Sequence, residues 1–333
     1  MGSSGVRAGT NRAAAMPQVD IDVLADVVAD GRIDTTLAET VTALRELPAR
    51  GGFPTGCTRL GGGFSAWRLA LQRGGGAAMA TLLADIRQRS GVALLVIPQE
   101  VERRYAHLAA QQALGPALRT AYILDIGGGS LQVAGATSSW GAALGQKLWK
   151  ALLCEHLRAR AACALGALDD TALSRARELA AREFAPLAAS LPGPVTLTAI
   201  SRPVIRGIHP ALQRLAQAGR IDPGLVDAQG FAAAAVTAAL AVLAPIGSEA
   251  RAQATGLATR FARYLLADLL LTEGILRATG AARLEVAESA VTNLPGLLAD
   301  ERAFAWAARY DCYLARLREL GEAAYAADPA RCE

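Results

Sequence analysis

The chain has 333 residues, of which 52% are hydrophobic, and its formal charge of +4 arises from 34 basic and 30 acidic side chains. It can fill the cores of about two domains, but its longest apolar run, residues 231–247, is mostly Ala, contains Pro245 and is shorter than the roughly 20 residues of a membrane span. No basic run is interleaved with aromatic residues as a nucleic-acid groove requires, and no secretory leader is recognisable, so we expect a globular cytoplasmic protein without nucleic-acid or membrane partners.

The cysteines and histidines do not form a metal-ligand pattern. The five cysteines are widely spaced and include no C-x-x-C motif: Cys57, Cys154, Cys163, Cys312 and Cys332. The three histidines are equally scattered: His107, His156 and His209. We therefore expect reduced thiols, without a disulfide framework or a zinc site, and histidines with surface or packing roles.

Hydrophobic periodicity and Gly or Pro breaks predict helices that alternate with short strands, which is typical of an α/β protein. Helices are expected at residues 20–30, 36–47, 77–89, 99–114, 170–189, 211–218, 231–243, 251–279 and 301–326. Strands are expected at residues 92–97, 122–125, 130–134, 195–199 and 284–287. The boundary between two domains is expected near Arg119.

The hairpin around residue 127 carries the clearest chemical signal. A strand of buried character ends in Asp125, the three glycines Gly127, Gly128 and Gly129 follow, and a second strand returns from Ser130. Glycines let backbone N–H groups approach phosphate oxygens closely, and a carboxylate at a strand end can hold a divalent cation. A Gly-rich hairpin turn without a ligand is the alternative, but three glycines exceed what a turn requires.

A short internal repeat supports the phosphate interpretation. Residues 2–9 (GSSGVRAG) resemble residues 128–135 (GGSLQVAG), and four of the eight aligned positions are identical. Two Gly/Ser loops, one opening each half of the chain, indicate a duplicated fold whose halves face a shared binding cleft.

Four segments resemble motifs of the exopolyphosphatase and guanosine pentaphosphate phosphatase (Ppx/GppA) family. The family's D-I-G-G-G-S motif is matched in full by residues 125–130, and its opening G-S-N-S-x-R loop resembles residues 2–7. Its S-A-x-R-x-A segment resembles residues 65–70, and its I-S-G-x-E-E-A-R segment resembles residues 97–104.

This resemblance implies an α/β fold of two ribonuclease-H-like (actin-like ATPase) domains that flank a central cleft. Residues 1–120 would form the first domain and residues 121–299 the second, while residues 300–333 would form a C-terminal helix that packs back on the first domain. The domain of HD type that longer family members carry at their C-terminus is missing, as it is in short members. A homodimer is left open.

The resemblance also implies the chemistry, which is the release of terminal phosphate from inorganic polyphosphate or guanosine pentaphosphate. Glu102 falls on the family's catalytic glutamate and would act as general base, while Asp125 would hold Mg²⁺. Phosphate would be bound by N–H donors and guanidinium groups of Gly2, Ser3, Ser4, Arg7, Arg68, Gly127, Gly128, Gly129 and Ser130. Without the resemblance, Glu102 is a carboxylate in the first turn of a helix, where the helix dipole favours it.

The chain departs from the family pattern at several positions. The family's third phosphate loop, G-x-S-G-T, is replaced by residues 198–203 (TAISRP), and Gln132 replaces a glutamate. The segment 287–292 (AESAVT) stands where the family has S-D-x-G-L-R, so an arginine is lost. These changes leave open a degenerate protein that binds a phosphorylated ligand without turning it over. A sugar or acetate kinase is a further alternative.

The first loop lacks the strand and the aspartate that precede it in the family. A loop that presents N–H groups to phosphate needs strands on both sides, yet only Met1 precedes Gly2. We expect Met1 to be an internal methionine of a longer product.

Overall fold

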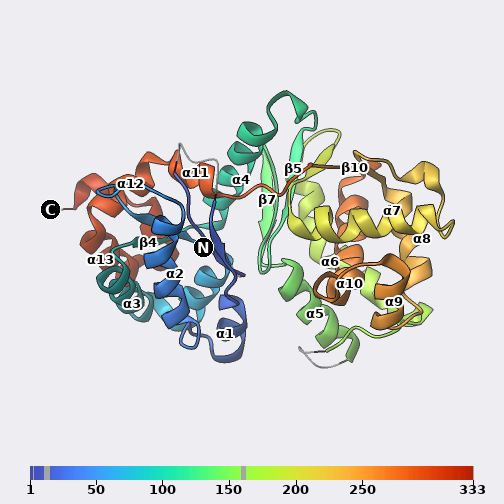
Figure 1. Cartoon of the computed structure of the whole chain (residues 1–333), viewed down its shortest axis with the longest axis horizontal. Coiled ribbons are helices and arrows are strands. Elements are labelled where there is room, and N and C mark those ends of the chain that lie inside the picture. Colours follow the sequence, from blue (N-terminus) through green and yellow to red (C-terminus); the bar gives the residue numbers. More distant parts are fainter. Residues whose placement is uncertain (3, 11–15, 159–162, 333) are drawn as a thin grey trace. The chain divides into compact units, whose positions relative to one another are not determined.

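The computed structural model describes residues 1–2, 4–10, 16–158 and 163–332. The chain divides into two compact units: unit 1 consists of Met1–Ala109 and Thr292–Glu333, and unit 2 of Ala110–Val291 (Figure 1). Among the described residues, no helix combines the length and the apolar character that crossing a membrane requires.

Unit 1 contains two small sheets. β1 (Val6–Arg7) pairs antiparallel with β2 (Gln18–Val19), and β3 (Leu60–Gly63) pairs parallel with β4 (Ala93–Val96). The helices of this unit are α1 (Val23–Asp30), α2 (Leu37–Arg50), α3 (Ser65–Ser90), α4 (Gln99–Leu114), α11 (Leu294–Leu298), α12 (Glu301–Ala308) and α13 (Tyr310–Leu320), followed by the 3-10 helices Gly321–Ala326 and Pro329–Arg331. The end of α4, from Ala110, already belongs to unit 2. The C-terminal helices return to the early part of the chain, because α13 contacts α3 and α12 contacts β4.

Unit 2 is built on a six-stranded sheet with the order β7-β6-β5-β8-β10-β9. Its strands are β5 (Tyr122–Ile126), β6 (Leu131–Gly135), β7 (Ser139–Ala142), β8 (Leu197–Ala199), β9 (Gly230–Ala232) and β10 (Arg283–Val286). The central pairs β5·β8 and β8·β10 are parallel, and the outer pairs are antiparallel.

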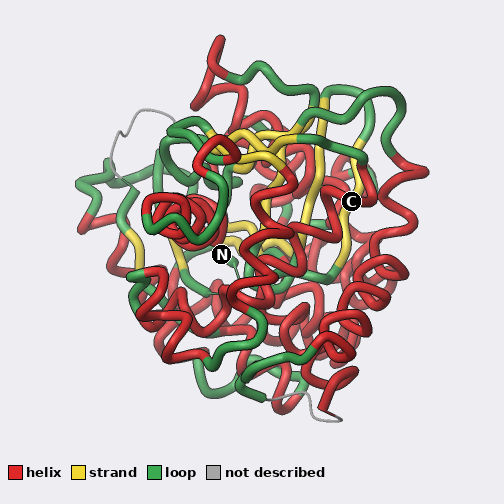
Figure 2. The backbone as a smooth tube through the Cα atoms, turned by 90° about the vertical axis from the view of Figure 1, so that its right-hand side faces the viewer, coloured by secondary structure: helices red, strands yellow, loops and turns green. Residues whose placement is uncertain are grey.

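Helices pack around this sheet, as the tube view also shows (Figure 2). They are α5 (Gln146–Arg158), α6 (Asp170–Ser190), α7 (His209–Gln217), α8 (Ala233–Leu243), α9 (Ser248–Thr255) and α10 (Thr259–Thr279), with a π-helical segment at Val204–Ile208 and a 3-10 helix at Pro223–Leu225. The long helix α10 contacts α5, α6, α8 and α9. Its residues from Leu265 to Leu276 are buried throughout, which explains their nearly continuous apolar sequence.

The alternation of side chains along β5 decides where its carboxylate points. Tyr122, Leu124 and Ile126 belong to the apolar core of unit 2. Successive side chains of a strand point to opposite faces, so Ile123 and Asp125 lie on the other face of the sheet. The fold therefore removes Asp125 from the main core and leaves it half-buried.

The predicted α/β class is confirmed, and most predicted elements are present within a few residues of the expected bounds. Glycines explain two differences. The helix expected at 251–279 is two helices, because Gly256 adopts a left-handed φ of 63° and ends α9. The helix expected at 77–89 is the second part of α3, which starts at Ser65 and is interrupted by a kink at Gly75, where φ is 78°.

The elements that were not predicted include α5, α11, β2, β3, β7 and β9. β3 consists of Leu60 and three glycines, which propensity disfavours in a strand, but its residues pair with the apolar β4. The single helix expected at 301–326 is also divided, because Arg309 leaves the helical conformation with φ −115° and ψ 46°.

The expectation of reduced thiols is wrong for four of the five cysteines. Cys154 and Cys163 form a disulfide with a Cα–Cα distance of 5.7 Å, and Cys312 and Cys332 form a second at 5.9 Å. Cys57 is free and exposed. The pairs are 9 and 20 residues apart in the sequence, and only the folding of each segment brings their sulfurs together. Spacing alone does not reveal such pairs.

The two disulfides predict a simple thiol count. The denatured, unreduced protein should react with one equivalent of a thiol reagent, at Cys57, and the reduced protein with five. Replacing Cys312 and Cys332 by Ser should lower the free energy of unfolding by roughly 3 kcal/mol, because the bond closes a loop of 20 residues in the unfolded chain. Five reactive thiols without reductant would contradict the assignment.

Candidate functional site

The turn after β5 presents backbone donors. The Gly127 N–H is used inside the turn, where it donates to the Ser130 carbonyl at 2.8 Å. The N–H groups of Gly128 and Gly129 have no hydrogen-bond partner in the described part of the chain. Of the predicted loop donors, these two are therefore available to an anion, whereas the Gly127 N–H closes the turn.

The first turn of α5 is hydrogen-bonded to this glycine turn and fixes its position. The N–H groups of Gln146 and Lys147 donate to the carbonyls of Gly127 and Gly128, at 2.9 and 2.7 Å. Gly145 must be glycine, because a Cβ there would lie 2.5 Å from the Gly127 carbonyl oxygen and 2.6 Å from the Ser130 nitrogen. With both carbonyls bound to α5, the turn has one defined orientation.

A buried carboxyl group in α10 holds the start of α5. Asp268 is 2% exposed, and its Oδ2 accepts a 2.6 Å hydrogen bond from the Gln146 side-chain amide. Burial raises the pKa of Asp268 to about 8, against the opposing effects of the Gln146 hydrogen bond and the charge of Lys150. Asp268 is therefore mainly protonated at neutral pH, when it adds little negative charge near the turn.

Gln132 lies beside Asp125. The two residues are Cα partners in the antiparallel β5·β6 ladder, so their side chains share one face of the sheet. Gln132 is 0% exposed, and neither its Oε1 nor its Nε2 has a hydrogen-bond partner among the described residues. A buried carboxamide without a partner is costly and points to a missing polar neighbour, such as water or a ligand.

Glu102 is a buried partner of Arg68 in unit 1. It is 4% exposed, and its Oε2 accepts a 2.6 Å hydrogen bond from Arg68 Nη2. Arg68, which is 5% exposed, also donates from Nη1 to the Ile97 carbonyl at 2.8 Å. The predicted general base and one predicted phosphate clamp thus form an ion pair, and the charge of Arg68 is already neutralised.

The segment before α11 brings a further side chain to Glu102. Asn293 Nδ2 donates to Glu102 Oε1 at 3.3 Å. Gly296 packs directly on Tyr105 of α4, where a Cβ would collide with the Tyr105 backbone. This contact docks α11 on α4 and places Asn293, although 191 residues separate it from Glu102.

The first Gly/Ser loop forms a tight turn before β1. The Gly2 N–H donates to the Gly5 carbonyl at 3.1 Å, and Ser4 lies within the turn. Arg7, on β1, donates from Nε to Gln18 Oε1 at 2.6 Å. Ser3, also predicted to bind phosphate, lies outside the described residues.

Sequence reasoning missed Asn293, Gln146 and Asp268. The signal for Asp268 was present, since it is one of two carboxylates, with Glu273, in a largely apolar helical stretch. Neither Gln146 nor Asn293 had such a signal, because each acts through a partner more than 100 residues away in the sequence.

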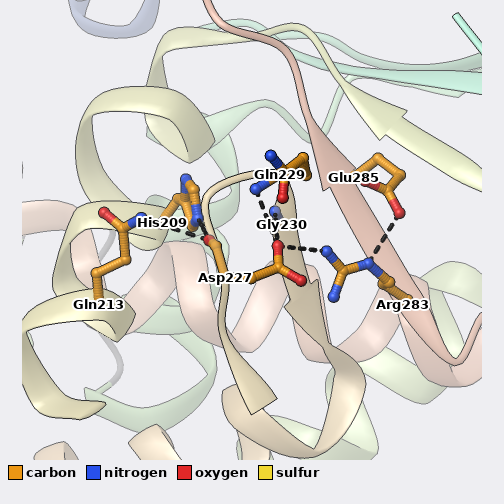
Figure 3. Close-up of polar contacts among 7 residues, drawn as sticks. All are labelled: His209, Gln213, Asp227, Gln229, Gly230, Arg283 and Glu285. Carbon is orange, nitrogen blue, oxygen red and sulfur yellow. Dashed lines mark hydrogen bonds and ion pairs between the residues drawn. The ribbon is translucent and has the colours of Figure 1, made fainter. Parts of the chain in front are cut away.

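A second polar cluster in unit 2 is structural. Asp227 Oδ1 accepts hydrogen bonds from the N–H groups of Gln229 and Gly230 and from Arg283 (Figure 3). The His209 ring and the Gln213 amide both contact the Asp227 carbonyl.

Arg283 also pairs with Glu285, at 2.8 Å, and the Arg283 hydrogen bond lowers the pKa of Asp227. These groups satisfy one another and join β9 to β10. The packing role expected for His209 is confirmed, because the ring is 7% exposed and bonded to a carbonyl.

The raised pKa of Asp268 predicts how stability depends on pH. The folded protein holds this proton up to about pH 8, whereas the ordinary pKa is 3.8, so the contribution of Asp268 is complete below about pH 4 and is lost as pH rises through 8. In the pH range where Asp268 is the only group whose proton binding differs between the folded and unfolded states, the free energy of unfolding should fall by about 1.4 kcal/mol per pH unit.

Asp268→Asn should remove this slope and be more stable than the wild type at pH 8, whereas Asp85→Asn at an exposed site should keep it. Thermal unfolding between pH 5 and 9 measures both. Parallel curves for wild type and Asp268→Asn would show that the carboxyl group is ionised at neutral pH.

The close contact at Gly145 predicts that a larger side chain at this position destabilises the fold. Gly145→Ala should lower the free energy of unfolding by about 1–3 kcal/mol, because the new methyl group must displace the turn. Gly166→Ala is the control, since a Cβ there meets no atom within 4 Å. Equal melting temperatures for the two variants would contradict the close contact.

Comparison with known proteins gives one consistent result. No protein-family model and no curated protein matches the chain. Among solved structures, the Ppx/GppA family member of Aquifex aeolicus matches with a TM-score of 0.65 and 20% identity, over 90% of this chain and 94% of that chain.

An exopolyphosphatase from Cytophaga hutchinsonii matches with a TM-score of 0.63 and 14% identity, over 90% of this chain and 94% of that chain. An exopolyphosphatase-like protein matches with a TM-score of 0.63 and 17% identity, over 93% of this chain and 97% of that chain. The chain has the two-domain α/β fold of the Ppx/GppA structures over about nine tenths of its length.

Proposed function

We propose that the protein is a phosphohydrolase of the Ppx/GppA type, which releases terminal phosphate from inorganic polyphosphate or guanosine pentaphosphate. The observation that carries this proposal is the glycine turn after β5, where the N–H groups of Gly128 and Gly129 have no partner in the described part of unit 2. Two such donors beside a carboxylate suit a phosphoryl group with its cation. The Ppx/GppA fold supports the same assignment.

Magnesium fits the residues next to this turn. Among the described residues, no group of three or more His, Cys, Asp or Glu side chains could hold a metal, but Mg²⁺ typically uses one or two carboxylates and completes its shell with phosphate oxygens and water. Asp125 would supply the carboxylate, and the orphaned Gln132 amide could contribute its oxygen. When bound, the ion neutralises charge on the phosphate oxygens.

Glu102 is the candidate general base in unit 1. Its carboxylate would accept a proton from the attacking water, while Asn293 and Arg68 fix the positions of its two oxygens. Arg68 therefore acts in this proposal as a positioning residue for Glu102. Its buried guanidinium already donates to Glu102 and to the Ile97 carbonyl, and breaking the ion pair would leave a buried charge without its partner.

Phosphate release from polyphosphate and guanosine pentaphosphate, with Mg²⁺ present, tests the proposal. Glu102→Gln keeps the shape of the side chain and an oxygen for Arg68, and it should lower kcat by about 10²-fold or more. Glu100→Gln, an exposed position on the same helix, should have the wild-type rate. Melting temperatures check that both variants are folded. Equal kcat values for wild type and Glu102→Gln would contradict the role of Glu102.

A binding protein without turnover is the second candidate, and Gln132 is the observation that favours it. The Ppx/GppA motif has a glutamate at this position, whereas a carboxamide can neither accept a proton efficiently nor supply negative charge to a cation. In that case polyphosphate should raise the melting temperature although no phosphate is released. Phosphate release that depends on Glu102 would exclude this candidate.

A further inference from the structure

The only two lysines of the chain lie in the first turns of α5, the helix whose start is hydrogen-bonded to the glycine turn. They are Lys147 and Lys150. The Lys147 N–H binds the Gly128 carbonyl at 2.7 Å, and Lys150 follows three residues later, about 4.5 Å further along the helix axis. Their positions place ammonium groups on the element that fixes the turn.

Two arginines of α10 extend this positive charge. Lys150 Nζ lies 4.9 Å from the centroid of the Tyr264 ring, and the guanidinium carbon of Arg263 lies 4.9 Å from the same centroid. Arg260, one turn earlier, lies over Phe261 at 5.1 Å. We call Lys150, Arg260 and Arg263 the cationic cluster.

The described residues provide no carboxylate partner for the cationic cluster. None of its three side chains forms an ion pair with a carboxylate among the described residues. Asp268 is the acidic group that acts on Lys150, but it is fully buried and bonded to Gln146. Burial lowers the pKa of Lys150, and the nearby positive charge of Arg263 lowers it further. A bound anion would relieve this repulsion.

We propose that the cationic cluster is a second anion subsite, which binds phosphate groups of the substrate beyond those at the glycine turn. The inference rests on the proposed function and narrows its substrate class to an extended phosphate chain. Arginine binds phosphate oxygens through two N–H groups at once, and lysine adds a mobile point charge. Three cations spread over α5 and α10 suit a chain that carries charge along its length.

The same geometry disfavours a nucleotide base at this place. An aromatic ring next to a phosphate site could stack a guanine, but Tyr264 is already covered by two cations. A chain of phosphates needs no stacking surface. Inorganic polyphosphate is therefore the substrate that the cationic cluster fits best.

Equilibrium binding without Mg²⁺ tests the subsite independently of turnover. The probes are tripolyphosphate, a long polyphosphate chain and a single-stranded DNA oligonucleotide of equal charge. The wild type should bind the long chain more tightly than tripolyphosphate or DNA. The double variant Lys150→Gln/Arg263→Gln should lose about tenfold or more in affinity for the long chain and less than about twofold for tripolyphosphate, since tenfold corresponds to about 1.4 kcal/mol.

Arg277→Gln is the matched control, because it removes the same charge from α10 about 21 Å further along the helix. It should bind all three probes as the wild type does. Equal affinities of Arg277→Gln and the double variant for the long chain, or equally tight binding of DNA by the wild type, would overturn the inference. Loss of long-chain affinity in a protein that releases no phosphate would support the subsite while contradicting the proposed function.

Discussion

The close contact between Gly145 and the glycine turn is the constraint on which the candidate phosphate site depends. A turn of consecutive glycines is flexible by itself, because glycine has few forbidden conformations. Here the start of α5 binds the carbonyls of Gly127 and Gly128, and the Gly145 backbone packs so closely on the turn that a Cβ there would collide with it. The donors of Gly128 and Gly129 are therefore oriented before any ligand arrives, which reduces the entropic cost of binding.

Buried polar groups maintain this order at a cost in stability. Burial in the apolar environment of α10 raises the pKa of Asp268, so its carboxyl group is mainly protonated at neutral pH. The same carboxyl group accepts a hydrogen bond from Gln146 at the start of α5. In unit 1, the opposite charges of Arg68 and Glu102 neutralise each other in a buried ion pair. Buried pairs of this kind contribute little to net stability, but removal of one partner is expensive. They therefore fix the positions of functional groups more than they stabilise the fold.

The sequence predicts the local elements well and the long-range partners poorly. The hairpin around Gly127 and the bounds of α4 follow from apolar runs, glycines and Pro98. The helix α5 was missed, so its two hydrogen bonds to the turn could not be foreseen. Asn293 meets Glu102, and Cys312 meets Cys332, only because the folded chain brings segments together that are separated in the sequence. No local sequence pattern indicates these contacts.

Binding of phosphate by the N–H groups of Gly128 and Gly129 is the central feature of the proposed site. Nuclear magnetic resonance of deuterated, ¹⁵N-labelled protein, titrated with a non-hydrolysable diphosphate analogue and Mg²⁺, observes these two amides directly. We expect saturable shifts that are largest at Gly128 and Gly129 and small at Gly127, whose N–H donates to the Ser130 carbonyl. Saturable binding that leaves Gly128 and Gly129 unshifted would contradict it.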